Sequence, residues 1–214
     1  MVVLWSLAWA VRADGPAVSD MMSAVQSDRA PRILVLGDSL SAAYGIRIEE
    51  GWVALLEQRL RERGLPHRVV NASISGETSA GGRARLPDLL ARDAYSVVIV
   101  ELGGNDGLRG LGVEQTRDNL RAIVRTARDA GARVLLVGMR LPPNYGSTYT
   151  EAFAAIFPEL AGQERVALVP FLLDGIATRP RLMQPDRIHP RAEAQGRMLD
   201  SVWPELEPLL EAGE

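Results

Sequence analysis

The feature that most constrains the fold is the segment at 96–102, Ser-Val-Val-Ile-Val-Glu-Leu, which is dominated by β-branched residues. An uninterrupted apolar run of this kind is typical of a strand that is covered on both faces. Such strands occur in parallel sheets that carry helices on either side. The sequence therefore predicts a buried central strand of an α/β sheet at this position.

Other short apolar runs alternate along the chain with segments of helical periodicity. We expect strands at 33–36, 68–72, 133–138 and 166–169, and helices around 52–60, 83–92, 113–127, 149–160 and from about 191 onwards. The proline at position 158 is expected to break the fourth of these helices. Strict alternation of strands and helices predicts a flavodoxin-like, three-layer α/β/α sandwich with a five-stranded parallel sheet in the order 2-1-3-4-5.

A chain of 214 residues suits one compact domain, which we place at 32–214. Residues 1–13 carry an apolar run of signal-peptide length, followed by small residues suited to cleavage but preceded by no basic residue. We expect a signal peptide at 1–13, a flexible leader at 14–31, and a periplasmic or secreted protein. The alternative is a cytosolic protein that starts at Met21 or Met22. No stretch reaches the roughly 20 apolar residues of a membrane span, so we expect no integral membrane association.

The net charge and the counts of cysteine and histidine exclude several classes of function. The formal net charge of -3, with no run of like charges, gives no electrostatic footprint for nucleic acid or anionic membrane, so we expect a neutral or small-molecule partner. We also expect a monomer. Without cysteine there is no thiolate nucleophile and no cysteine-based zinc site. Because the chain has two histidines, an imidazole base must be His67 or His189.

The candidate nucleophile lies in the turn after the first predicted strand, Gly37-Asp38-Ser39-Leu40-Ser41. Ligands of open parallel sheets bind at the carboxyl ends of strands, and Gly37 allows a sharp turn there. Ser39 is therefore the candidate. The alternative is an ordinary strand-to-helix turn in which Asp38 and Ser39 cap the next helix. Only partners elsewhere in the chain decide between the two interpretations.

Right-handed crossovers place the carboxyl ends of all parallel strands at one edge of the sheet, so loops far apart in sequence converge there. His189 has a carboxylate, Asp186, three residues earlier that could accept its Nδ1–H while Nε2 faces Ser39. Pro190 is expected at the first position of the last helix, where it would hold this loop rigidly. An ordinary loop histidine is the alternative. His67 has no such carboxylate nearby and is expected at the surface.

Attack on a carbonyl group develops an oxyanion, which needs hydrogen-bond donors aimed at it. The candidates, all in predicted strand-end loops, are the Ser39 N–H, the Gly76 N–H and the side-chain amide of Asn105. Taken singly, Gly76 is explained as a turn glycine and Asn105 as a turn or cap residue. Their joint placement after successive strands favours the functional interpretation.

Four blocks of the sequence, at 37–41, 71–79, 103–106 and 186–189, resemble those of the SGNH (GDSL) hydrolase family in order and spacing. Segments 102–110, 141–146 and 186–190 are similar to its periplasmic bacterial thioesterase, lysophospholipase and arylesterase subgroup, and the likeness runs from about Arg32 to the C-terminus.

The resemblance implies the SGNH hydrolase fold, no metal or cofactor, and hydrolysis of acyl esters, thioesters and lysophospholipids. It makes Ser39 the nucleophile, Asp186 and His189 the other triad members, and Ser39, Gly76 and Asn105 the oxyanion hole. Substrate contacts are expected from Leu141, Pro142, Asn144, Tyr145 and Ile188. Arg187 stands where close relatives often have a small residue, and adds a positive group near the expected pocket.

Two alternatives remain open from the sequence. One is a carbohydrate O-deacetylase of the same family. The other is a flavodoxin-like binding module whose strand-end loops hold an anionic ligand without chemistry. The α/β-hydrolase family is disfavoured, because residues 37–41 lack the second glycine of its G-x-S-x-G elbow.

Overall fold

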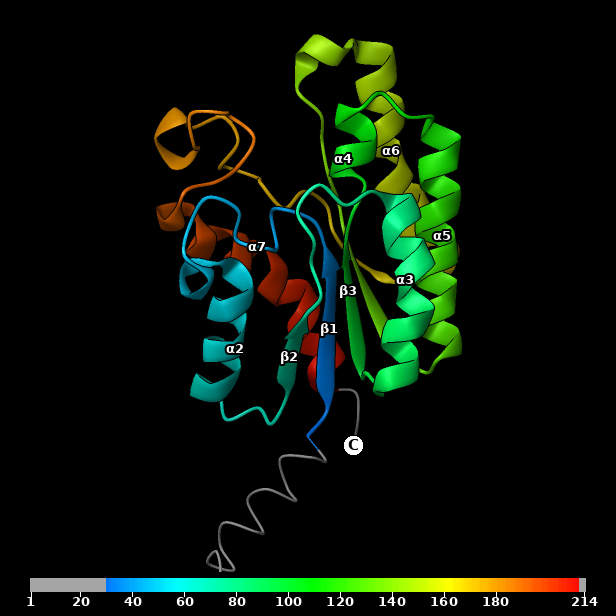
Figure 1. Cartoon of the computed structure of the whole chain (residues 1–214), viewed down its shortest axis with the longest axis vertical. Helices are drawn as coiled ribbons and strands as arrows, with labels where there is room; N and C mark the ends of the chain where they lie inside the picture. Colours follow the sequence, from blue (N-terminus) through cyan, green and yellow to red (C-terminus); the bar gives the residue numbers. More distant parts are fainter. Residues whose placement is uncertain (1–29, 212–214) are drawn as a thin grey trace, which may run out of the picture. The chain divides into compact units, whose positions relative to one another are not determined.

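The structure is a computed structural model that describes residues 30–211. Its centre is one parallel sheet of five strands in the order β2-β1-β3-β4-β5, which confirms the predicted fold class and strand order (Figure 1). The strands are β1 (Arg32–Gly37), β2 (Arg68–Asn71), β3 (Val97–Glu101), β4 (Arg133–Val137) and β5 (Ala167–Val169).

Helices cover both faces of the sheet. They are α2 (Trp52–Glu62), α3 (Ser79–Arg92), α4 (Gly104–Leu108), α5 (Val113–Asp129), α6 (Ser147–Glu164) and α7 (Ala192–Glu211), with 3-10 turns η1 (Ile48–Glu50), η2 (Pro143–Tyr145) and η3 (Pro180–Leu182). Helices α2 and α7 lie on one face, and α3, α5 and α6 lie on the other (Figure 1). The result is a three-layer sandwich in which every strand's carboxyl end points to the same edge.

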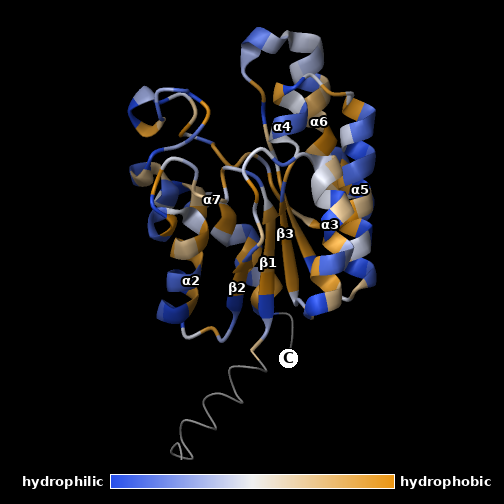
Figure 2. Ribbon diagram, viewed as in Figure 1, coloured by the Kyte–Doolittle hydropathy of each residue, from blue (hydrophilic) through white to orange (hydrophobic). Residues whose placement is uncertain are grey.

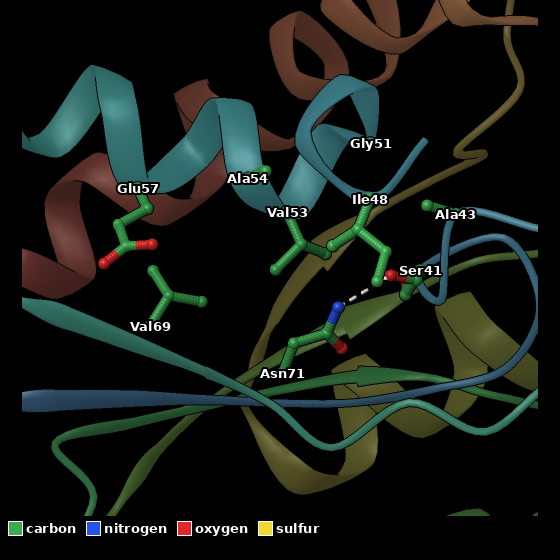
Figure 3. A pocket seen from close by; sticks show the side chains of 9 residues that line it. All are labelled: Ser41, Ala43, Ile48, Gly51, Val53, Ala54, Glu57, Val69 and Asn71. Atoms are coloured by element: carbon green, nitrogen blue, oxygen red, sulfur yellow. Dashed lines mark hydrogen bonds between the residues drawn. The ribbon is translucent and has the colours of Figure 1, made fainter. Parts of the chain in front are cut away.

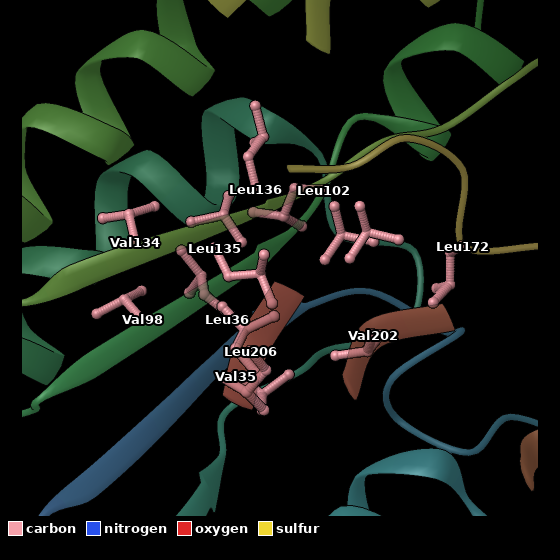
Figure 4. Close-up of a cluster of buried hydrophobic side chains, with 14 of the residues drawn as sticks. Val35, Leu36, Val98, Leu102, Val134, Leu135, Leu136, Leu172, Val202 and Leu206 are labelled. Carbon is pink, nitrogen blue, oxygen red and sulfur yellow. The ribbon is translucent and has the colours of Figure 1, made fainter. Parts of the chain in front are cut away.

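The core consists of the two-faced strands and the apolar sides of the helices. Hydropathy colouring shows apolar strands between helices whose outer faces are polar (Figure 2). Val35 of β1, Leu135 of β4 and Val202 and Leu206 of α7 belong to one cluster of buried side chains (Figure 4). All five residues of β3 are buried, which confirms the central strand predicted at 96–102. Fully burying one such aliphatic side chain contributes roughly 1.5–3 kcal/mol.

The prediction that Pro158 breaks its helix is wrong, because α6 continues through it to Glu164. Proline within a helix removes one hydrogen bond and costs about 3 kcal/mol. Phe157 and Leu160, on either side of Pro158, are both buried in the core. Burial of this helix face therefore outweighs the local preference of the proline.

His67 was expected at the surface, but it is buried, with 9% of its area exposed. It precedes β2 at the amino edge of the sheet, where it lines a cavity together with Leu65, Arg133 and Leu210. Burial, followed by the positive charge of Arg133, lowers the pKa of His67. Arg133 and Leu210, which line this cavity with His67, are distant from it in sequence, which is why the local pattern around His67 did not reveal its burial.

Within 30–211, no helix is both long and apolar enough to cross a membrane. The predicted signal peptide at 1–13, the leader up to position 29, and the alternative starts at Met21 and Met22 all lie outside the described residues.

Candidate active site

Ser39 lies in the tight turn that leaves the carboxyl end of β1, as the sequence predicted. The turn is closed by backbone hydrogen bonds from Ala42 N to Asp38 O (2.9 Å) and from Tyr44 N to Ser39 O (3.2 Å). Asp38 Oδ1 accepts the N–H of Leu40 at 3.0 Å, a local bond typical of aspartate in turns. The Ser39 side chain is thereby held at the sheet edge, where it is half-buried.

The back of this turn is fixed by the neighbouring strand. Asn71 at the end of β2 donates from Nδ2 to the Ser41 carbonyl oxygen at 2.9 Å (Figure 3). Both residues line a small cavity of about 130 Å³ that also includes Ile48 and Val53 (Figure 3). The nucleophile turn is therefore tied to β2 as well as to β1.

His189 and Asp186 meet Ser39 in the predicted geometry. His189 Nε2 lies 2.9 Å from Ser39 Oγ, and His189 Nδ1 lies 2.7 Å from Asp186 Oδ2. Asp186 Oδ1 also accepts the backbone N–H groups of Ile188 and His189, each at 3.0 Å. Burial raises the pKa of Asp186, but the bonds from the His189 ring and these two N–H groups outweigh it, so the net pKa is lowered. Asp186 is thus an ionised acceptor at neutral pH.

The loop that carries this pair is anchored differently from the prediction. Pro190 does not start the last helix, because α7 begins at Ala192. Instead Pro190 forms an isolated antiparallel bridge with Met183, and Gln184 N donates to His189 O at 2.7 Å. Pairing with the strand-like segment before the loop therefore provides the rigidity that the sequence analysis assigned to the helix start.

Tyr44 is a neighbour of the site that the sequence analysis missed. Its ring packs against the His189 ring with centroids 4.4 Å apart and an interplanar angle of 39°. Gln184 Nε2 donates to the Tyr44 carbonyl oxygen at 2.8 Å, which links the two loops. Nothing in the local pattern distinguished Tyr44 from an exposed turn residue.

The two other oxyanion-donor candidates lie at the same edge of the sheet. Gly76 is in the turn between β2 and α3 with φ +80°, a conformation that favours glycine, and its carbonyl accepts from Arg109 Nη2 at 2.8 Å. Asn105 was expected in a loop but lies in the first turn of the short helix α4. Its Nδ2 donates to Asp38 Oδ2 at 2.9 Å. Asn105 and the residue before Ser39 are therefore directly joined.

Two buried acids lie beneath the nucleophile turn. Asp38 is 2% exposed and Glu101, the last residue of β3, is fully buried. Glu101 Oε2 accepts the Asp38 N–H at 3.2 Å and the Ser41 hydroxyl at 2.5 Å. Burial raises the pKa of Asp38 to about 6, against the bonds from Leu40 and Asn105 that lower it. Burial and then the Asp38 charge raise the pKa of Glu101 well above its ordinary value.

An apolar cavity of about 410 Å³ opens beside the nucleophile turn. It is lined by Leu40 and by three of the predicted substrate contacts, Leu141, Pro142 and Ile188, and its wall also includes Arg187. The other two predicted contacts are not part of this lining. Asn144 is exposed, and Tyr145 directs its hydroxyl to the Leu108 carbonyl oxygen at 2.9 Å, which ties the loop to the end of α4.

In the part of the chain that the structure describes, no three histidine, cysteine, aspartate or glutamate side chains gather in a way that could hold a metal ion.

A serine–histidine–aspartate chain at the carboxyl edge of a flavodoxin-like sheet, next to an apolar cavity, is the arrangement of a serine-dependent acyl-transfer site. The model of the GDSL-like Lipase/Acylhydrolase family matches residues 35–197, and the chain belongs to this family.

Three comparisons describe its relatives. The chain is 54% identical over 185 residues to Esterase TesA of Pseudomonas aeruginosa, covering 86% of this chain and 92% of the relative. It is 46% identical over 181 residues to Thioesterase 1/protease 1/lysophospholipase L1 of Escherichia coli strain K12, covering 85% and 86%. A crystal structure of TesA superposes with a TM-score of 0.82 at 54% identity, covering 83% of this chain and 99% of that one.

Proposed function

We propose that the protein is a serine hydrolase that cleaves carboxylic esters and thioesters through an acyl-enzyme intermediate. The observation that carries the proposal is the continuous line of contacts from Ser39 Oγ to His189 Nε2 (2.9 Å) and from His189 Nδ1 to Asp186 Oδ2 (2.7 Å). The names of the relatives, esterase and thioesterase 1/protease 1/lysophospholipase L1, support the same class of reaction.

The first half of the reaction forms the acyl-enzyme. An ionised Asp186 accepts the Nδ1–H of His189, which leaves the Nε2 lone pair facing the Ser39 hydroxyl. His189 takes the hydroxyl proton as Ser39 Oγ bonds to the substrate carbonyl carbon, and the C=O electron pair moves onto the oxygen. When the tetrahedral intermediate collapses, the bond to the leaving alkoxide or thiolate breaks, and that group receives the proton from His189.

The second half reverses these roles with water. His189 removes a proton from a water molecule, which attacks the acyl carbon of the ester on Ser39. Collapse releases the carboxylic acid, and Ser39 Oγ recovers its proton from His189. In both halves the oxyanion is held by the Ser39 N–H, the Gly76 N–H and the Asn105 amide. The Asn105–Asp38 bond supports this role because it fixes the orientation of the amide in advance.

The apolar cavity beside Ser39 is the proposed acyl site. Leu40, Leu141 and Ile188 on its wall suit the hydrocarbon part of an acyl group, and a volume of about 410 Å³ leaves room for a chain longer than acetyl. This lining favours acyl esters and thioesters over an acetylated sugar, so we do not propose the O-deacetylase alternative. Asn144 and Tyr145 are proposed to shape the loop behind Leu141 and Pro142, with Tyr145 as its anchor on α4.

We also propose that the protein is exported, on the basis of the apolar run in 1–13. Protein recovered from the periplasm or medium should begin near Asp14. An intact Met22 terminus in the cytosol would contradict export without affecting the proposed chemistry.

The function is tested by comparing wild type with Ser39→Ala on a chain-length series of p-nitrophenyl esters and acyl-CoA thioesters. The variant should retain the wild-type melting temperature and lose turnover of both classes, because a half-buried turn hydroxyl contributes little to stability. Ser201→Ala is the matched control. It removes a hydroxyl whose bond goes to the carbonyl of Arg197 in its own helix, and it should keep full activity. Normal turnover by Ser39→Ala would overturn the proposal.

A further inference from the structure

The strand register places an acid directly beneath the nucleophile turn. Gly37, the last residue of β1, pairs with Glu101, the last residue of β3. A Cβ atom at Gly37 would lie 2.8 Å from Glu101 Oε2 and 2.8 Å from Ser41 Oγ, so the glycine is what lets the carboxyl group pack against the turn. The mechanism proposed above does not use this buried acid.

The surroundings of Glu101 do not suit a second negative charge. Among residues 30–211 no arginine, lysine or histidine forms an ion pair with it, and its Oε1 atom is buried without a hydrogen-bond partner. The ionisable groups that face the site are Asp38, from the turn after β1, and His189, whose charge acts on Asp38 from the loop before α7. Two adjacent buried carboxylates cannot both stay ionised without a counter-charge.

The hydrogen bonds indicate which of the two acids keeps the proton. Asp38 accepts on both oxygens, from Leu40 N and from Asn105 Nδ2, and each bond favours the ionised form. Glu101 accepts on Oε2 alone, so an ionised Glu101 would leave charge on Oε1 with no donor. The negative charge of Asp38 also raises the pKa of Glu101, so a proton on Glu101 removes the repulsion between the two carboxyl groups.

We propose that Glu101 is a positioning residue: it remains protonated at neutral pH and donates to the Asp38 carboxylate, so that one negative charge orients Asn105 for the oxyanion. The charge-assisted bond at 2.9 Å from Asn105 Nδ2 to Asp38 Oδ2 engages one amide hydrogen and leaves the second free to point at the substrate. Glu101 acts through Asp38 and Ser41 and touches no reacting atom. The role in turnover rests on the proposed function, whereas the protonation state does not.

The raised pKa of both acids agrees with this arrangement. The pair shares one proton and titrates as a unit. Below about pH 6 the pair takes up a second proton, which neutralises Asp38 and removes the charged acceptor of Asn105. Ionised Asp38 beside neutral Glu101 is therefore the state that serves the reaction at neutral pH.

Two substitutions of Glu101 test whether its side chain acts as a hydrogen-bond donor or as an ionised carboxylate. Glu101→Gln keeps the shape and is neutral, and its amide can donate to Asp38 while its carbonyl accepts from Ser41. We expect its kcat to stay within a few-fold of wild type. Glu101→Ala removes the donor, so the nucleophile turn and Asn105 lose their alignment, and kcat should fall on the order of 10- to 10²-fold with a smaller change in KM. A kcat for Glu101→Gln as low as that for Glu101→Ala would overturn the positioning role.

Infrared spectroscopy tests whether Glu101 is protonated, without relying on an activity assay. Wild type and Ser39→Ala at neutral pH should show the C=O stretch of a buried, protonated carboxylic acid, and Glu101→Gln should lack it. Glu164→Gln is the matched control. Glu164 is 7% exposed but forms ion pairs with Arg125 at 2.8 Å and Arg128 at 3.6 Å, unlike Glu101, so its replacement should leave the band unchanged. Absence of the band in wild type would overturn the inference even if the protein proves to be an active esterase. Its presence in an inactive protein would leave the protonation intact and reject the proposed function.

Discussion

Replacing Asn105 by alanine tests whether its side-chain amide acts in catalysis or only stabilises the local structure. The side chain donates to Asp38 Oδ2 at 2.9 Å and, in the proposed mechanism, also to the developing oxyanion. The second bond strengthens as charge appears, so its loss should affect kcat far more than substrate binding. For a single side-chain donor of this kind we expect kcat to fall on the order of 10²–10³-fold, or about 2.7–4 kcal/mol.

The same substitution has a separate structural cost. Losing a hydrogen bond to a charged group costs about 1.5–3 kcal/mol. Two effects reduce this cost. Asp38 keeps the hydrogen bond from Leu40 N. The bond from Asn105 lowers the pKa of Asp38, so losing that bond raises this pKa above about 6 and favours the uncharged acid. We therefore expect a lower melting temperature together with the much larger loss of kcat.

The assay measures kcat, KM and melting temperature on one preparation. Asn119→Ala serves as the matched control. It removes a buried amide that bonds Ser79 Oγ at 3.1 Å and Arg83 at 3.2 Å on α3, and should lower the melting temperature with little change in kcat. If Asn105→Ala behaves in the same way, with kcat of the folded fraction near wild type, Asn105 is a structural residue and the proposed oxyanion hole is wrong.

Two further predictions concern the acid pair and the acyl site. The folded-state pKa of Asp38, about 6, lies above its ordinary 3.8, so the folded protein binds more protons than the unfolded chain between about pH 4 and 6, and stability should fall as pH rises through this window. The shift in the pKa of Asp38 corresponds to on the order of 3 kcal/mol. Urea unfolding should show that wild type loses this much more free energy of unfolding between pH 4 and pH 7 than Asp38→Asn does. An equal pH dependence in both proteins would contradict the prediction. Leu141→Trp, which fills the cavity, should reduce kcat/KM for octanoyl esters far more than for acetyl esters, and an equal loss for both would place the acyl chain elsewhere.

Much of the fold followed from local patterns. The short apolar runs, above all the β-branched run of β3, predicted a sheet covered by helices on both faces. The alternation of strands and helices predicted the observed strand order. The convergence of Ser39, His189 and Asp186 followed in turn, since crossover handedness brings strand ends to one edge. The errors arose where distant packing overrides a local preference, as at Pro158 within the buried helix α6.

The buried acid could not be inferred in this way. A glutamate at the end of an apolar run is the ordinary sign that a strand is reaching solvent, and only the pairing of Gly37 with Glu101 places its side chain under the nucleophile turn. The same holds for Asn105. The glycine-rich stretch around it predicted a loop, whereas Gly103 (φ +107°) is the N-cap of helix α4, in whose first turn the Asn105 amide donates to Asp38. Contacts between segments about 60 residues apart carry no local signal.

The most direct test of the central claim is covalent labelling with an alkyl p-nitrophenyl phosphonate, followed by mass spectrometry of the intact chain and its peptides. A phosphonate reacts with an activated serine and mimics the tetrahedral intermediate, so wild type should gain one phosphonyl group per chain, on Ser39, with matching loss of esterase activity. Ser39→Ala should gain none, and Asn105→Ala should react more slowly. Wild type that hydrolyses esters yet stays unlabelled, or a Ser39→Ala variant that is labelled to the same extent, would contradict the assignment of Ser39 as the nucleophile.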